Sequence, residues 1–337
     1  MTAGPPSNFL RRTQGARKII VIDLGFLGDS VHLVPPLWEL RRNYPGAEIH
    51  TLSAPVGAEV LQLAPCVTRP WAFPLTPESP PWWRHWGLIG ELRRERFDVA
   101  YNFSGADRTI FLTALTGAPH RAAHAAGRDH FWNRWLIRDW VPRQNRDLPV
   151  FEQRRQVLAA CGCTLEAARF DLQPPDDALK WAHSAVPPQS VHFSINASGP
   201  EKEWPLERWS ALTRALLEVR PALSLVATAG AKPRERERLE SLRAAVNNSR
   251  LLCFDSLPIA RFAALLQRCR LHVGADSGAL HLAFAMGAPT LGLFRQYEGL
   301  KEWQPRGPHD RALVGATLDA VSGEAAFAAA LEMLPAV

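Results

Sequence analysis

The chain has 337 residues, of which 47% are hydrophobic and 21% are charged. This composition excludes a disordered or fibrous protein, and the length predicts two domains of roughly 150 residues each. The formal net charge of +6 comes from 39 basic and 33 acidic residues. Because the basic residues are scattered and no nucleic-acid-binding motif is present, the charge favours small anionic ligands and indicates no nucleic-acid partner.

The termini and cysteines give the cellular context. Residues 1–16 lack an apolar core of signal-peptide length, and we interpret them as a disordered leader. The longest uncharged run, 277–294, is interrupted by Gly and Pro and does not resemble a membrane span. Five cysteines without CxxC spacing predict buried, reduced thiols and no metal site. A cytoplasmic protein is expected.

The first half of the chain alternates apolar strands with helices. Strands are predicted at 18–23, 47–52 and 99–103, and helices at 31–42 and 56–64. This alternation is typical of an α/β domain with a parallel sheet covered on both faces. The segment 65–86, rich in Trp and Pro, is predicted as a long loop. Its indoles either pack on their own domain or contact an acceptor or a membrane surface.

A second α/β domain follows a proline-flanked helix. The pairs Pro174-Pro175 and Pro187-Pro188 suggest a connector at 176–189, between domains at 17–175 and 190–337. Strands are then predicted at 191–196, 223–228, 251–254, 271–273 and 289–294. Helices are predicted at 206–219, 235–246, 259–268 and 279–286. The expected fold class is therefore α/β, with two doubly wound, Rossmann-like domains.

The segment 274–294 contains a strand, a tight turn and a helix. Unpaired N–H groups and the positive dipole end at the start of a helix form an anion site, which suits a phosphate. The alternative is an ordinary turn in which Asp276 or Ser277 only caps the helix.

Three segments in order carry a family resemblance: 24–35 (LGFLGDSVHLVP), 196–205 (NASGPEKEWP) and 274–283 (GADSGALHLA). Together they resemble the heptosyltransferase family of lipopolysaccharide core assembly. The resemblance implies a GT-B glycosyltransferase, with two Rossmann-like domains facing a cleft. It also implies an ADP-L-glycero-D-manno-heptose donor and inversion at the anomeric carbon. No metal or cofactor is expected, because the three segments contain no metal-binding Asp-x-Asp pair. The implied acceptor is a Kdo or heptose residue of the lipid A-linked inner core, which is compatible with peripheral contact at the inner membrane.

In the N-terminal half, Asp29 matches the family's catalytic aspartate, so the resemblance implies a general base for the acceptor hydroxyl. Its alternative role is to cap the helix predicted to begin near Val31. Gly28 would let the acceptor approach the backbone closely. Asp23 is acidic where many relatives are basic, and we assign it no role. Three arginines are candidates for binding an acidic acceptor: Arg108, Arg121 and Arg128.

In the C-terminal half, Lys202 matches the lysine that the family places at the donor phosphates, where it would offset charge on the departing ADP. Asn196 and Ser198 could donate to the same phosphates. The turn Asp276, Ser277 and Gly278 would supply main-chain N–H groups, with Asp276 ordering the turn or receiving a sugar hydroxyl.

Three further residues leave alternatives open. Glu235 and Glu237 are both candidates for binding the donor ribose, and their spacing does not decide between them. His281 either faces the donor or satisfies a hydrogen bond in the core.

Two other functions are compatible with these motifs. The acceptor could be a protein hydroxyl or another glycan, or the chain could be an inactive nucleotide-sugar-binding protein. A dehydrogenase is disfavoured because no GxGxxG follows the first strand.

Overall fold

The computed structural model describes residues 8–74, 84–124, 130, 132–141 and 145–334. The chain divides into two compact units, Met1–Gln173 and Pro174–Val337. Each unit contains one six-stranded sheet in which all paired strands are parallel. The central strands of each sheet are short, mostly apolar runs that are buried on both faces, as a helix-covered parallel sheet requires, whereas the edge strands are partly exposed.

The sheet of the first unit has the strand order β3-β2-β1-β4-β5-β6. Its strands are β1 (Lys18–Ile22), β2 (Glu48–Ser53), β3 (Arg69–Ala72), β4 (Val99–Asn102), β5 (His120–His124) and β6 (Asp139–Val141). Its helices are α1 (Phe9–Thr13), α2 (Leu27–Val31), α3 (Val34–Asn43), α4 (Pro55–Leu61), α5 (Trp86–Arg94), α6 (Asp107–Leu115), α7 (Asn133–Leu136) and α8 (Val150–Ala160).

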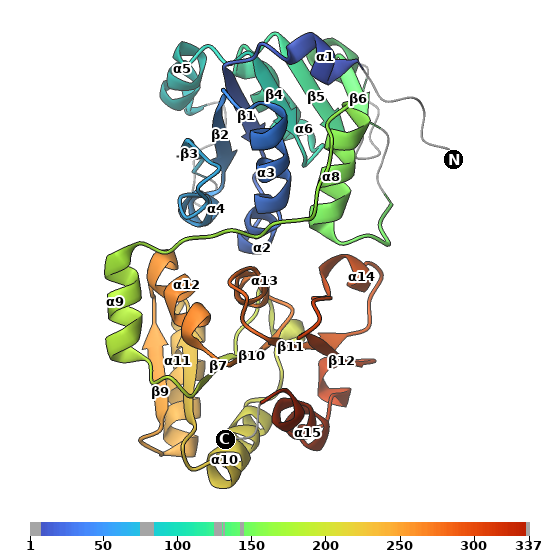
Figure 1. Cartoon of the computed structure of the whole chain (residues 1–337). Coiled ribbons are helices and arrows are strands. Elements are labelled where there is room, and N and C mark those ends of the chain that lie inside the picture. Colours follow the sequence, from blue (N-terminus) through green and yellow to red (C-terminus); the bar gives the residue numbers. More distant parts are fainter. Residues whose placement is uncertain (1–7, 75–83, 125–129, 131, 142–144, 335–337) are drawn as a thin grey trace. The chain divides into compact units, whose positions relative to one another are not determined.

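Helices cover both faces of this first sheet. Helices α5 and α6 pack on one face through an apolar cluster that includes Ile20, Ile22, Ile89 and Leu112. Helices α3 and α8 lie side by side over the other face (Figure 1). The loop after β1 and helix α2 follow the carboxyl ends of the strands, where ligands bind in open α/β sheets.

The sheet of the second unit has the strand order β12-β11-β10-β7-β8-β9. Its strands are β7 (Ser190–Ser194), β8 (Ser224–Ala229), β9 (Leu251–Asp255), β10 (Leu271–Ala275), β11 (Thr290–Arg295) and β12 (Arg311–Gly315). Its α-helices are α9 (Asp176–Ala185), α10 (Leu206–Val219), α11 (Pro233–Val246), α12 (Ile259–Arg268), α13 (Gly278–Ala285), α14 (Leu300–Trp303) and α15 (Gly323–Met333). Two 3₁₀ turns, η2 (Pro200–Lys202) and η3 (Leu318–Ala320), complete it.

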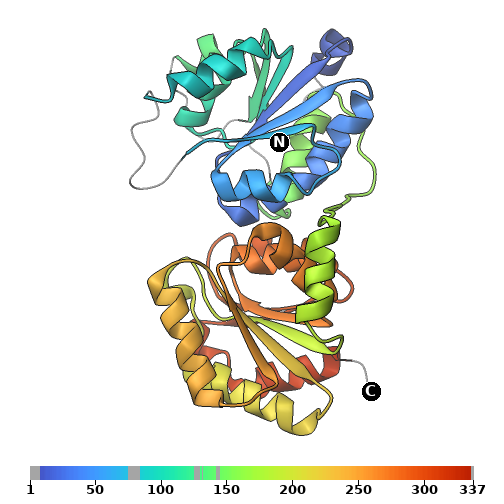
Figure 2. The ribbon, with the colours of Figure 1, turned by 90° about the vertical axis from the view of Figure 1, so that its left-hand side faces the viewer.

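The main core of the second unit lies on one face of its sheet. Trp204, Trp209, Leu216 and Leu242 belong to an apolar cluster contributed by α10, α11, α15 and the strands. Figure 2 shows α11 and α9 on opposite faces of this sheet. Helix α9 packs against α12 through alanines that include Ala182. The connector predicted at 176–189 is thus largely a helix that belongs to the second unit.

The α/β fold class is confirmed, and two predicted helices, 206–219 and 259–268, match α10 and α12 residue for residue. The helix predicted at 31–42 corresponds to α3, but its predicted start is wrong, because a separate short helix, α2, precedes it and ends at Val31. Helix α3 restarts at Val34, with the prolines at its first positions, where a missing N–H costs no hydrogen bond.

Two predicted irregular segments contain regular structure. The supposed disordered leader includes helix α1, whose Phe9 is buried edge-on against Tyr101 with ring centroids 5.4 Å apart. The supposed loop 65–86 contains β3, whose Trp71 is buried and donates to His50 Nδ1 at 3.1 Å. Pro70 is tolerated because β3 is an edge strand. Trp82 and Trp83 lie outside the described residues.

The cysteine prediction agrees with the structure. All five cysteines are free thiols; four are buried and Cys253 is half-buried. Burial raises the pKa of the Cys66 thiol to about 12, so this thiol stays protonated near neutral pH.

Candidate active site

Asp29 lies at the carboxyl edge of the first sheet, in the short helix that follows β1. It is the third residue of α2, and its Oδ2 accepts the N–H of Phe26 at 2.9 Å. This bond satisfies a free donor at the start of the helix. A Cβ at position 25 would lie 2.4 Å from the Asp29 Cβ, so the turn requires Gly25. Asp29 therefore does stabilise a helix start, yet its side chain keeps 24% of its surface exposed.

The environment of Asp29 makes its carboxylate more basic. Burial raises its pKa above the usual value; Arg154 lowers it and Asp23 raises it. A raised pKa brings a carboxylate closer to the range that suits a general base near neutral pH. This property does not follow from the capping role, and it supports the catalytic interpretation.

Sequence reasoning missed Arg154, which holds Asp29 from α8. Its Nη1 donates to the Asp29 carbonyl oxygen, and its Nη2 lies 2.6 Å from Asp23 Oδ2 and 3.3 Å from Asp29 Oδ1. Val150, Arg154 and Val157 are all buried and share one face of α8. A charged residue at an apolar position of that face was the signal that could have identified it.

The other candidates of the first unit are spread over the sheet. Gly28 is buried in α2, and Arg108 is exposed in the first turn of α6. Arg121 pairs with Ala100, two positions before the carboxyl end of β4, so it lies toward the opposite edge from Asp29. Arg128 lies outside the described residues. The structure thus places Arg108 at the carboxyl edge and Arg121 away from it.

Asp276 is the centre of the candidate site in the second unit, at the carboxyl edge where β7 and β10 are neighbours. Its Oδ2 accepts from Lys202 Nζ at 3.2 Å and from the Tyr297 hydroxyl at 3.0 Å. Tyr297 was not predicted, because it follows β11 outside any recognised motif. Burial, followed by Asp276, raises the pKa of Tyr297, which keeps this hydroxyl a donor. The Asp276 carboxylate therefore holds both the Lys202 ammonium group and the Tyr297 hydroxyl in place.

His281, in α13, is buried close to the Asp276 carboxylate. It is 4% exposed, and its Nε2 is 3.9 Å from Asp276 Oδ1. Burial lowers its pKa to about 4, so the ring is neutral near pH 7. Of the two predicted roles, the structure favours a buried polar group beside Asp276.

The start of α13 has the backbone geometry of a helix N-terminus. Ser277 is the N-cap residue, with no side-chain capping bond, and Gly278 is the first helical residue. The Ser277 hydroxyl lies 3.5 Å from the Ser194 hydroxyl at the end of β7. Both hydroxyls and the helix N–H groups can donate to an anion at this edge.

The two candidate ribose-binding residues differ in burial. Glu235 Oε2 accepts the N–H of Gly230 at 2.9 Å, and its carbonyl accepts from Asn196 Nδ2 at 3.4 Å. Glu237 is exposed, as is Ser198. The Asn196 Oδ1 is buried and has no partner among the described residues. Glu235 is therefore fixed by the turn after β8, and Asn196 retains a free acceptor.

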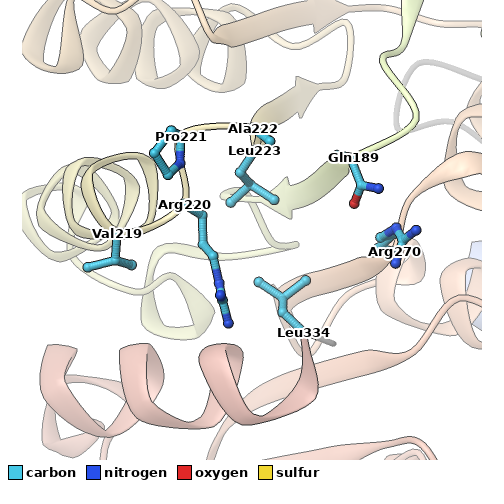
Figure 3. Close-up of a pocket in the computed structure, with 8 residues that line it drawn as sticks. All are labelled: Gln189, Val219, Arg220, Pro221, Ala222, Leu223, Arg270 and Leu334. Carbon is cyan, nitrogen blue, oxygen red and sulfur yellow. The ribbon is translucent and has the colours of Figure 1, made fainter. Parts of the chain in front are cut away.

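A cavity of about 220 Å³ lies elsewhere in the second unit. Figure 3 shows Arg220, Leu223, Arg270 and Leu334 around it. Leu223 and Arg270 precede β8 and β10, so this cavity lies at the amino edge of the sheet, opposite Asp276. It is not part of the candidate active site.

Two other kinds of feature are absent from the described ranges. These ranges contain no group of three or more His, Cys, Asp or Glu side chains placed to hold a metal ion. None of their helices is long and apolar enough to cross a bilayer.

Comparisons with known proteins identify the family. The sequence model of glycosyltransferase family 9 (heptosyltransferase) matches residues 85–320. The chain is 26% identical over 291 residues to lipopolysaccharide heptosyltransferase 1 of Pseudomonas aeruginosa, covering 82% of this chain and 78% of that protein. It is 22% identical to lipopolysaccharide heptosyltransferase 2 of Escherichia coli, with 82% of each chain covered.

Solved structures show the same GT-B fold. The structure of E. coli ADP-heptose lps heptosyltransferase II aligns with a TM-score of 0.78 at 18% identity, covering 94% of this chain and 98% of that one. E. coli heptosyltransferase WaaC with ADP-2-deoxy-2-fluoro heptose aligns with a TM-score of 0.76 at 16% identity, covering 94% and 100%. Since the family match spans most of the chain, the protein is a glycosyltransferase and belongs to family 9, the heptosyltransferases.

Proposed function

We propose that this enzyme transfers heptose from ADP-L-glycero-D-manno-heptose, with inversion, to a Kdo or heptose residue of the lipid A-linked inner core. The observation that carries the proposal is Asp29, a partly exposed carboxylate at the carboxyl edge of the sheet whose pKa is raised by burial. The relatives that are lipopolysaccharide heptosyltransferases support the acceptor class. The structure of a relative with an ADP-heptose analogue supports the donor class.

In the proposed reaction, an Asp29 carboxylate oxygen accepts the proton of the acceptor hydroxyl. The hydroxyl oxygen forms a bond to the anomeric carbon of heptose from the face opposite the diphosphate. The bond between that carbon and the diphosphate oxygen breaks, and its electron pair leaves with ADP. One proton moves to Asp29 and one negative charge develops on ADP, so the step is balanced.

Lys202 and the start of α13 serve the leaving group in this proposal. The ammonium group, held by Asp276 at 3.2 Å, offsets charge as ADP departs. The N–H groups from Gly278 onward and the Ser277 hydroxyl donate to the phosphates. Glu235, which the turn after β8 fixes in place, is our candidate for binding the ribose.

In this proposal the transfer requires no metal or cofactor, because the Lys202 ammonium group and the N–H groups at the start of α13 take the place of a divalent cation. A lipid-linked acceptor further implies that a cytoplasmic enzyme would meet its substrate at the inner-membrane surface. Both statements are parts of the proposal.

The direct test measures ADP release and product mass with ADP-heptose and a series of truncated lipopolysaccharides, each with and without excess EDTA. We expect turnover with an inner-core acceptor that ends in Kdo or heptose, at the same rate in EDTA. Turnover with a protein or another glycan as acceptor would contradict the proposed inner-core acceptor. ADP-heptose binding without transfer to any acceptor would indicate an inactive binding protein, and a rate restored by Mg²⁺ would contradict the metal-independent step.

A further inference from the structure

A buried ion pair lies beside Asp29 and takes no part in the mechanism above. Asp23 directly follows β1 and Arg154 lies on α8; their side chains are 4% and 8% exposed, and 2.6 Å separates Asp23 Oδ2 from Arg154 Nη2. We propose that Asp23 and Arg154 are positioning residues that fix the Asp29 carboxylate and preserve its basicity. This inference rests on the proposed role of Asp29 as the base.

The geometry fixes the turn at several points. The Arg154 guanidinium contacts Asp29 twice, through the main-chain carbonyl and through Oδ1. Asp23 Oδ1 accepts the N–H of Gly25 at 2.9 Å, while Asp29 Oδ2 accepts the N–H of Phe26. Both ends of the turn are therefore tied to one guanidinium, and a planar fork loses little entropy in making such contacts. The Asp29 carboxylate is thus held in place while some of its lone pairs accept no hydrogen bond from the described residues.

The charges explain why two acids share one cation. A guanidinium alone beside Asp29 would form a close pair with it and make it a weaker base. Instead, Asp23 takes the shorter contact, 2.6 Å, and leaves the contact from Arg154 to Asp29 Oδ1 at 3.3 Å. The opposing effects of Arg154 and Asp23 on the pKa of Asp29 agree with this division. An acidic residue at position 23 thereby acquires a role.

The other ionisable groups around α2 are engaged elsewhere or exposed. Arg155, the next cation on α8, pairs with Glu39 of α3 and with Glu152. Glu59, the charged residue of α4, is exposed. His32, at the end of α2, stacks on an aromatic ring of α8, with centroids 5.9 Å apart. Asp23 and Arg154 are therefore the charges that determine the basicity of the carboxylate.

The test compares Asp23→Asn with Arg154→Gln in the full-length protein, using ¹³C-carboxyl NMR titration of Asp29, whose signal is assigned by its loss in Asp29→Asn. Asp23→Asn removes the negative neighbour and frees the guanidinium, so the pKa of Asp29 should fall. Arg154→Gln removes the cation, so that pKa should rise. The acidic limb of the pH profile of kcat/KM should shift in the same way, to lower pH in Asp23→Asn and to higher pH in Arg154→Gln. In both variants kcat should fall by about 10²-fold, because the base is misplaced.

Arg154→Lys and the double variant Asp23→Asn/Arg154→Gln keep the test decisive if a single variant folds poorly. Arg154→Lys keeps the charge and loses the fork, so the pKa of Asp29 should stay near the wild-type value while kcat falls. The double variant should return that pKa toward wild type. Shifts in the same direction, or unchanged kcat in folded variants, would overturn the inference. The NMR titration needs no turnover, so a failure of the proposed transfer reaction appears separately, as a wild-type protein without activity.

Discussion

The two units hold their key carboxylates in different ways. In the first, Asp29 is tied to a buried ion pair whose members are 4% and 8% exposed. In the second, Asp276 pairs with Lys202, and these side chains are 14% and 30% exposed. Removing one partner of a buried pair is costly because the remaining charge cannot return to water, whereas a pair with a partly exposed cation is screened by solvent and weaker. In the proposed function, the first arrangement fixes the base in one place, and the second lets Lys202 exchange its carboxylate partner for a phosphate.

The largest effect that the comparison predicts is on catalysis. Asp29→Asn keeps the shape of the side chain and removes the proposed base, so turnover should fall on the order of 10²–10⁴-fold. ADP affinity should be unchanged, because the proposed ADP-binding residues belong to the second unit. Steady-state kinetics and calorimetric ADP titration on the same preparation measure both quantities. Near wild-type turnover would contradict the role of Asp29, and a large loss of ADP affinity would contradict the division between units.

The next prediction compares the two ion pairs directly through stability. Arg154→Met leaves the buried Asp23 carboxylate without its cation, which should cost about 3–5 kcal/mol of the free energy of unfolding. Lys202→Met, the matched control, should cost at most about 1 kcal/mol. Urea unfolding followed by circular dichroism measures both values. Equal losses in the two variants would show that burial does not distinguish the pairs.

The fold could be predicted largely because strands and helices alternate clearly in the sequence. The predicted strands of the second unit fall on β7 to β11, and α10 and α12 were predicted to the residue. Helix α1 and strand β3 were missed because the Arg and Pro residues in these segments disfavour regular structure locally. The burial of Phe9 and Trp71 in the core stabilises both elements nevertheless. Such packing is invisible in a local pattern.

The candidate site was predictable only where a motif carried it. Lys202 and Asp276 lie in two predicted motifs, and the structure brings them together. Arg154 and Tyr297 belong to no motif, and only the packing of α8 and the path of the chain after β11 place them beside the carboxylates. The spacing of Glu235 and Glu237 in the sequence did not distinguish them; the structure does, through the partial burial of Glu235 and the hydrogen bond that it accepts from Gly230.

A third prediction uses pH, because the second sheet contains a pair of neutral histidines. His192 on β7 and His272 on β10 are fully buried, with their Nδ1 atoms 2.8 Å apart. Burial lowers the pKa of both, that of His272 to about 3. The unfolded chain binds protons below about pH 6.5 while the folded unit does not, so stability falls as the pH falls.

From pH 7 to pH 5.5, the proton uptake of each histidine in the unfolded chain should lower the free energy of unfolding by about 1.3 kcal/mol, or by roughly 2.5 kcal/mol for the pair. Hydrogen exchange read by mass spectrometry should show faster opening of β7 and β10 at pH 5.5, with less change in β1 and β4. His192→Gln cannot titrate and serves as the control, since it should reduce the dependence on pH. Equal acid sensitivity of both sheets would contradict the assignment.

The smallest predicted effect concerns the pair of Lys202 and Asp276 itself. Lys202→Ala removes the proposed charged hydrogen bond to the ADP phosphates, so ADP binding should weaken by about 1–3 kcal/mol, with little loss of fold stability. Lys180→Ala, an exposed lysine on α9, controls for the loss of one positive charge. Arg121→Ala controls for a cation of the first unit and should leave ADP affinity unchanged, with any effect appearing in the acceptor KM. If ADP affinity falls in Arg121→Ala and is unchanged in Lys202→Ala, Lys202 does not bind the donor. The contrast between Asp29 as a fixed base and Lys202 as a cation that exchanges partners would then be wrong.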